Sequence, residues 1–189
     1  VRRRADRLSE AGFTVLAPDL ALGVRPSSED EAERALGEAD PNRIASLVFS
    51  SAQLLADKSS PGPIGVMGFG SGGSLALWLS VRRARIVTAA VSFYGSQAID
   101  FAGAGAGYQI HLAEADRFIS HDEAAFMEAT MGLESLEVVT HVYPGTRHGF
   151  ADPESPAYDP EAAELAWDRA VEFLRGRLAP LRPQPSPTA

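Results

Sequence analysis

Cysteine is absent from all 189 residues of this chain. Its absence excludes disulfide bonds, thiolate metal sites and a cysteine nucleophile. Disulfides belong to oxidising compartments, so a chain without cysteine is expected, by default, to be cytoplasmic.

Long apolar runs and excess positive charge are also missing. No apolar stretch approaches the length that crosses a membrane, and no apolar segment follows Val1-Arg2-Arg3-Arg4 as it would in a secretory signal. The net charge of −8 disfavours nucleic acid and anionic membranes as partners. These absences leave a small molecule as the expected partner.

What the sequence does contain is an alternation of short apolar strands and helices. We expect strands at 13–17, 64–67, 86–93, 108–113 and 136–143, and helices at 2–10, 29–36, 41–54, 74–79, 120–131 and 161–178. Such an alternation predicts an α/β fold, with a mostly parallel sheet and helices on both faces. A single domain is expected over residues 1–179. Residues 180–189 contain four prolines and are expected to form a disordered tail.

The carboxyl ends of the strands hold the candidate functional residues, because ligands bind at that edge of a parallel sheet. One strand ends at the glycine-rich turn 68–73, the next candidate ends at Glu114-Ala115-Asp116, and the last ends at the segment 144–149 with His148. Turn, acid and histidine follow one another in the order of the α/β-hydrolase triad.

The chemistry of a triad explains this set of residues. The His148 imidazole would take the proton of a nucleophile, and the Asp116 carboxylate would orient the ring and stabilise its charged form. An aspartate after a strand is more often a turn or helix cap. The position and order of Asp116 and His148 nevertheless favour a hydrogen-bonded catalytic pair. His111 and His141 lie within strands and are interpreted as packing or surface residues.

Four segments together resemble the dienelactone hydrolase family. They are the elbow Gly68-Phe69-Gly70-Ser71-Gly72-Gly73, the strand 90–95, the acid segment 114–116 and the histidine loop 143–150. The resemblance covers nearly the whole chain. It implies an α/β-hydrolase fold and a carboxylic ester or lactone hydrolase with a nucleophile, Asp116 and His148, without cofactor or metal.

The nucleophile is the first departure from the family pattern. The family's cysteine falls on Gly70, which has no side chain but suits the strained turn of the elbow. Ser71 is the alternative nucleophile, although that register puts Phe69 where a small residue is needed. Two possibilities stay open: Ser71 attacks, or Gly70 holds the elbow and the chain has lost its nucleophile.

Two further departures concern the start of the chain and the substrate. The resemblance implies strands before residue 1, one of them central in the sheet, so we expect an N-terminally incomplete hydrolase domain of low stability. Dienelactone hydrolases have an arginine four residues after the histidine, where it holds the substrate's carboxylate. This chain has Asp152 there. A dienelactone substrate is therefore not expected.

Two other classes of function are considered. Gly68-x-Gly70-x-x-Gly73 also fits a dinucleotide fingerprint, but the next strand lacks the acid that binds the ribose. The second is a non-catalytic binding protein that keeps the hydrolase fold, as the glycine at position 70 would allow.

Overall fold

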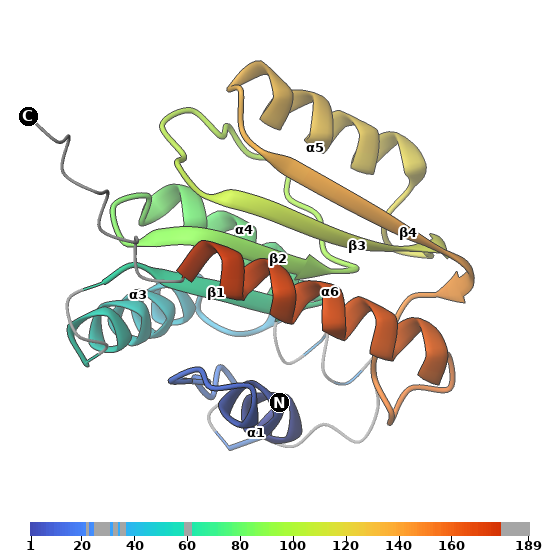
Figure 1. The fold of residues 1–189 in the computed structure, drawn as a ribbon, viewed down its shortest axis with the longest axis horizontal. Coiled ribbons are helices and arrows are strands. Elements are labelled where there is room, and N and C mark those ends of the chain that lie inside the picture. Colours follow the sequence, from blue (N-terminus) through green and yellow to red (C-terminus); the bar gives the residue numbers. More distant parts are fainter. Residues whose placement is uncertain (22, 25–30, 32–33, 35–36, 59–61, 179–189) are drawn as a thin grey trace, which may run out of the picture.

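The computed structural model describes residues 1–178, except for 22, 25–30, 32–33, 35–36 and 59–61 (Figure 1). The described elements follow the order α1 (Arg2–Glu10), α3 (Pro41–Lys58), β1 (Ile64–Phe69), α4 (Ser71–Arg82), β2 (Val87–Phe93), β3 (Gly107–Ala115), α5 (His121–Leu133), β4 (Val138–Arg147) and α6 (Pro160–Leu178). The tail 180–189 and most of the helix expected at 29–36 lie outside the described residues.

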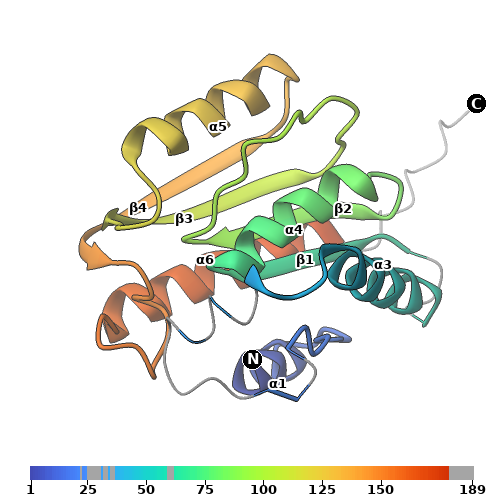
Figure 2. The same cartoon turned by 180° about the vertical axis from the view of Figure 1, so that it is seen from behind.

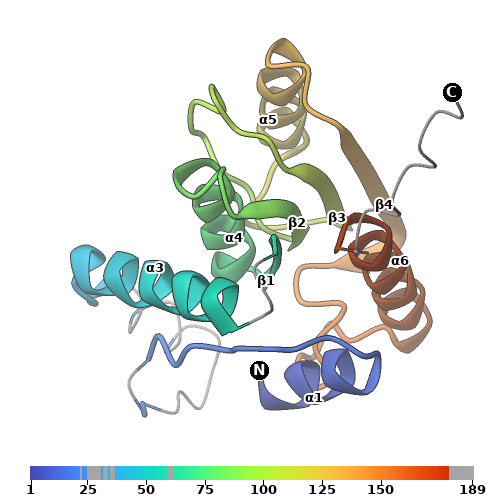
Figure 3. The same ribbon diagram turned by 60° about the vertical axis from the view of Figure 1, so that its left-hand side comes forward.

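The four strands form one parallel sheet in the order β1-β2-β3-β4. The views from the front, from behind and along the sheet show helices on both of its faces (Figures 1, 2 and 3). The predicted α/β class, with a parallel sheet covered on both faces, is confirmed. None of the helices in the described ranges is both long and apolar enough to cross a bilayer.

Strand β2 packs against helices on both faces of the sheet. All but one of its residues are buried, as expected for a strand covered on both faces. Ala90 faces a cluster that contains Leu77 of α4 and Met127 and Met131 of α5. Val91, its neighbour, faces the opposite cluster with Ala166, Ala170 and Leu174 of α6. Alternate side chains of one strand therefore contribute to the cores on both sides of the sheet.

Local signals in the sequence set the ends of several helices. Ser120 precedes α5 and forms a capping box, in which its hydroxyl accepts from the Glu123 amide and Glu123 accepts from the Ser120 amide. Asp40 accepts a hydrogen bond from the Asn42 amide at the start of α3. These side chains satisfy amides that have no partner inside the helix.

The prediction of a strand at 13–17 was wrong. This segment runs outside the sheet, and Phe13 instead packs against the α6-side core. A run of apolar residues makes a strand only where a neighbouring strand accepts and donates the ladder hydrogen bonds. The edge of β1 receives no such partner from the described part of the chain.

Candidate active site

Each of the four strands delivers one residue to the same edge of the sheet. Gly70 follows β1, Tyr94 follows β2, Asp116 follows β3 and His148 follows β4. Parallel strands end at a common edge, so residues far apart in the sequence lie close together there. The candidate site is this row of strand ends.

The last part of β4 is irregular, and this irregularity places His148. Residues 144–147 were expected in a loop, but they continue the strand as far as Arg147. Ala113 pairs with Tyr143 and Ala115 with Arg147, so β4 has extra residues opposite β3. Gly145, with φ of 73°, donates its amide to Glu114 Oε2 at 2.8 Å. Such a bulge redirects the chain, here bringing His148 next to the end of β3.

Asp116 and His148 form a hydrogen-bonded pair. Nδ1 of His148 lies 2.9 Å and 2.8 Å from the two carboxylate oxygens of Asp116. The Asp116 carboxylate also accepts from the amides of Phe118 and Ile119. Its side chain is 4% exposed and that of His148 is 13% exposed. Because an ionised carboxylate only accepts, Nδ1 carries the proton and Nε2 is the acceptor in neutral imidazole.

Gly70 occupies the elbow between β1 and α4. It is the N-cap of α4, with φ of 55° and ψ of −127°, a conformation that residues with side chains rarely adopt. A Cβ on Gly68 would lie 1.9 Å from the Gly72 carbonyl oxygen, so the turn requires glycine at position 68 too. Gly70 therefore has the positive φ that is expected of an elbow residue between a strand and a helix.

Ser71 is the first residue of α4 and is exposed. Among the residues that the structure describes, no hydrogen bond joins its hydroxyl to the His148 ring. The elbow position that brings a side chain towards the histidine belongs to Gly70 instead. The structure therefore brings Asp116, His148 and Gly70 together at one edge of the sheet.

Two aromatic residues contact the His148 ring, and the sequence reasoning missed both. The Tyr94 ring meets it edge-on at 4.9 Å between centroids, and the Phe118 ring does so at 4.7 Å. Tyr94 is 4% exposed and has φ of 38°. The position of Tyr94 directly after a buried strand was the sequence feature that could have placed it at this edge of the sheet. Phe118 is 40% exposed and offers an apolar surface beside the imidazole.

A buried polar network lies behind the site. His111 in β3 is fully buried, and its ring is hydrogen-bonded to the Tyr143 hydroxyl and to Gln109. Arg169 of α6 donates to the same hydroxyl at 3.3 Å. Burial, then the nearby charges of His141 and Arg169, lowers the pKa of His111 to about 3. His111 is thus a neutral structural residue, in line with the packing role expected from its strand.

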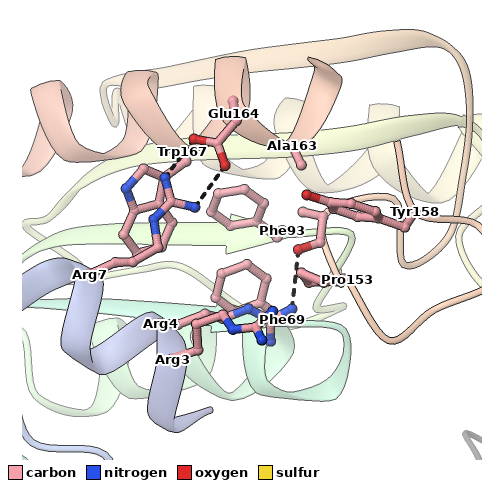
Figure 4. Close-up of a pocket in the computed structure, with 11 residues that line it drawn as sticks. Arg3, Arg4, Arg7, Phe69, Phe93, Pro153, Tyr158, Ala163, Glu164 and Trp167 are labelled. Atoms are coloured by element: carbon pink, nitrogen blue, oxygen red, sulfur yellow. Dashed lines mark hydrogen bonds and ion pairs between the residues drawn. The ribbon is translucent and has the colours of Figure 1, made fainter. Parts of the chain in front are cut away.

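A separate cavity lies between α1 and α6, and its lining includes neither Asp116 nor His148. Figure 4 shows Arg4 over the ring of Phe69, and Arg7 paired with Glu164 of α6. Arg4 also lies 3.3 Å from the carboxylate of Asp152. Asp152, at the position of the family's substrate-binding arginine, therefore pairs with the first helix.

The arrangement can supply general acid–base chemistry. A neutral histidine oriented by a carboxylate takes a proton at Nε2 and returns it to a leaving group. Over the described ranges, no three histidine, aspartate or glutamate side chains form a group that could hold a metal ion.

Comparison with known proteins identifies the family. The profile of the Dienelactone hydrolase family matches residues 1–178. The chain belongs to the dienelactone hydrolase family. A relative from Aquifex pyrophilus, "Protein usf", is 28% identical over 184 residues, which cover 93% of this chain and 80% of the relative. A candidate carboxymethylenebutenolidase from Aquifex aeolicus is 27% identical with the same coverage.

Solved structures agree on the fold. A candidate dienelactone hydrolase from Klebsiella pneumoniae superposes with a TM-score of 0.81 at 19% identity. The match covers 92% of this chain and 79% of the Klebsiella chain. A dienelactone hydrolase-like promiscuous phosphotriesterase from metagenomic libraries gives 0.76 at 18% identity, covering 94% and 80%. Residues 68–73 thus form the turn between β1 and α4 of a chain that belongs to the dienelactone hydrolase family.

Proposed function

We propose that this protein hydrolyses a small carboxylic ester or lactone, with His148 as general base and Asp116 as the group that orients it. One observation carries the proposal: Nδ1 of His148 is held by the Asp116 carboxylate, while Nε2 faces the elbow. In a hydrolase, Nε2 takes a proton from the attacking group and later returns it to the leaving group. Membership of the dienelactone hydrolase family supports the same reaction class.

The surroundings of the pair favour an uncharged, partly apolar substrate. Phe118 presents an exposed ring beside His148, where an acyl or aryl group can pack. Asp152 stands where dienelactone hydrolases place a carboxylate-binding arginine, and it is already paired with Arg4. A substrate with a free carboxylate would lack that partner, so we propose a neutral ester or lactone.

A second candidate function is non-catalytic binding by a hydrolase fold. Gly70 favours it, because the elbow carries no attacking side chain. The Asp116–His148 pair favours catalysis instead, since a binding protein has no need for a histidine that is oriented for proton transfer.

Hydrolysis of p-nitrophenyl acetate and butyrate separates the two candidates. We expect turnover by the purified protein that falls about 10²- to 10⁴-fold in His148→Ala, the range typical of a general base. His121→Gln is the matched control, because His121 is an exposed histidine at the start of α5. Equal rates in the wild type and His148→Ala would refute the hydrolase proposal and favour the binding protein.

A further inference from the structure

Arg4 of helix α1 contacts two segments that lead to opposite sides of the candidate site. Its guanidinium carbon lies 3.7 Å from the centre of the Phe69 ring, and Figure 4 shows the two side chains together. The same guanidinium donates to the Ala151 carbonyl at 3.3 Å and lies 3.3 Å from the Asp152 carboxylate. The Arg4 side chain is 20% exposed, so these contacts are largely shielded from water. One side chain therefore joins the end of β1 to the segment after His148.

On the β1 side, Arg4 acts next to the elbow. Phe69 is the last residue of β1 and directly precedes Gly70. The Phe69 ring stacks on that of the fully buried Phe93, at 4.4 Å between centroids. The Phe93 carbonyl also accepts from the Gly70 amide at 2.9 Å. Phe69 and Gly70 are thus held to the same residue of β2, which makes the end of β1 a firm support for Arg4.

On the other side, Arg4 grips a segment that is short and folded on itself. The Asp152 amide donates to the Gly149 carbonyl at 2.9 Å, and the Ser155 amide donates to the Asp152 carbonyl at 2.9 Å. A Cβ on Gly149, which has φ of 83°, would lie 2.7 Å from the Ser155 hydroxyl, so the turn is tightly packed. A displacement at Asp152 is therefore passed to Gly149, the residue that follows His148.

We infer that Arg4 is a positioning residue, which holds the segment 149–155 against the end of β1 and so fixes the separation between Gly70 and His148. That separation is 3.6 Å, from a Cβ built on Gly70 to Nε2 of His148. The inference rests on the proposed function, because only a His148 that transfers protons at the elbow needs a fixed distance to it. A displacement of about 1 Å, caused by a change far from the reacting atoms, lowers an enzymatic rate about a hundredfold.

A purely structural role for Arg4 is the alternative, and Arg7 of the same helix provides the comparison. Arg7 is bonded to the Glu164 carboxylate at 2.6 Å and 3.0 Å, and its guanidinium carbon lies 4.3 Å from the centre of the Trp167 ring. Like Arg4, it makes an ion pair and a cation–π contact, but both of these partners belong to α6. Loss of either arginine should weaken the fold similarly, whereas loss of Arg4 alone should release His148.

Arg4→Gln and Arg7→Gln separate the two roles. With p-nitrophenyl butyrate, Arg4→Gln should lower kcat about 10- to 100-fold and change KM less than about twofold, because the substrate still binds but proton transfer is misaligned. Arg7→Gln should leave kcat unchanged. Urea titrations show that both variants are folded and compare their midpoints. A folded Arg4→Gln variant with the wild-type kcat, or equal losses of kcat in both variants, would overturn the inference.

Asp152→Asn removes the ion pair from its other side and keeps the test decisive if Arg4→Gln does not fold. Asparagine keeps the acceptor for the Glu154 amide but loses the charge. The variant should lower kcat by less than Arg4→Gln does, because the contacts of Arg4 with Phe69 and Ala151 remain. The double variant should lose no more than Arg4→Gln, since both changes break one link. An unchanged kcat in folded Asp152→Asn, or losses that multiply in the double variant, would contradict that link.

Amide hydrogen exchange, followed by mass spectrometry, measures the positioning without relying on activity. In Arg4→Gln the amides of residues 149–155 should exchange faster than in the wild type, and in Arg7→Gln they should not. Faster exchange in this segment together with the wild-type kcat would overturn the inference and leave the hydrolase proposal intact. Equal rates of hydrolysis in the wild type and His148→Ala would instead refute the hydrolase proposal, so the two failures are distinguishable.

Discussion

Gly70 faces the His148 ring, and a side chain at position 70 would point towards Nε2 of that ring. The Cβ position of Gly70 is 3.6 Å from Nε2, and the opposite nitrogen of the same ring is 2.8 Å from Asp116. Asp116 thus holds the His148 ring with Nε2 turned towards the elbow, where residue 70 carries no side chain.

The Asp116 carboxylate should be essential for the rate. Asp116→Asn keeps the shape of the side chain but can no longer fix Nδ1–H, so the ring can adopt the wrong tautomer. In a triad the corresponding change lowers turnover about 10⁴-fold. Initial rates with p-nitrophenyl butyrate measure the effect. Asp122→Asn, an exposed aspartate in the first turn of α5, is the control, and an equal loss in both variants would contradict the role of Asp116.

Two glycines of the elbow should respond oppositely to alanine. A Cβ on Gly68 would meet the Gly72 carbonyl at 1.9 Å, so Gly68→Ala should lower the free energy of unfolding by at least about 2 kcal/mol. A Cβ on Gly72 meets nothing within 4 Å, and alanine favours the helix by up to about 1 kcal/mol. Urea titrations followed by tryptophan fluorescence compare the variants. If Gly68→Ala and Gly72→Ala unfold at the same urea concentration as the wild type, the close contact between residue 68 and the Gly72 carbonyl is contradicted.

Histidine 111 should make stability depend on pH. Its pKa is about 3 in the folded chain and ordinarily 6.5, so below pH 6.5 the unfolded chain binds a proton that the folded chain does not. The free energy of unfolding should therefore fall with decreasing pH, by up to about 1.4 kcal/mol per unit. Urea titrations between pH 6.5 and 5 should show a smaller slope in His111→Gln. An unchanged slope, equal to that of His121→Gln, would contradict a buried neutral His111.

Much of the fold follows from the sequence because local and global signals agree. Helix α1 was predicted at its observed bounds, and the apolar runs of β1 to β4 each end within four residues of the prediction. The pairing of Asp116 and His148 followed from the rule that parallel strands end at one edge. Strand-end position and chain order required no knowledge of side-chain packing.

Other features depend on contacts that no local pattern encodes. The segment 13–17 has the composition of a strand, but a strand also needs a hydrogen-bonding neighbour. The bulge of β4 arises from pairing between Glu114 and Gly145, 31 residues apart. The sequence favours Gly70 as the elbow, because that register keeps both flanking glycines whereas the Ser71 register keeps only Gly73. The backbone angles of Gly70, which no local pattern encodes, came only from the structure. The ring contacts of Tyr94 and Phe118 were likewise visible only in three dimensions.

The most direct test of the account is the rate of p-nitrophenyl butyrate hydrolysis by Ser71→Ala, set against the wild type and His148→Ala. The account predicts that Ser71→Ala keeps at least about half of the wild-type rate, because its hydroxyl takes no part in the reaction. His148→Ala should lose about 10²- to 10⁴-fold in the same assay. A loss in Ser71→Ala as large as that in His148→Ala would contradict the account and identify Ser71 as the nucleophile.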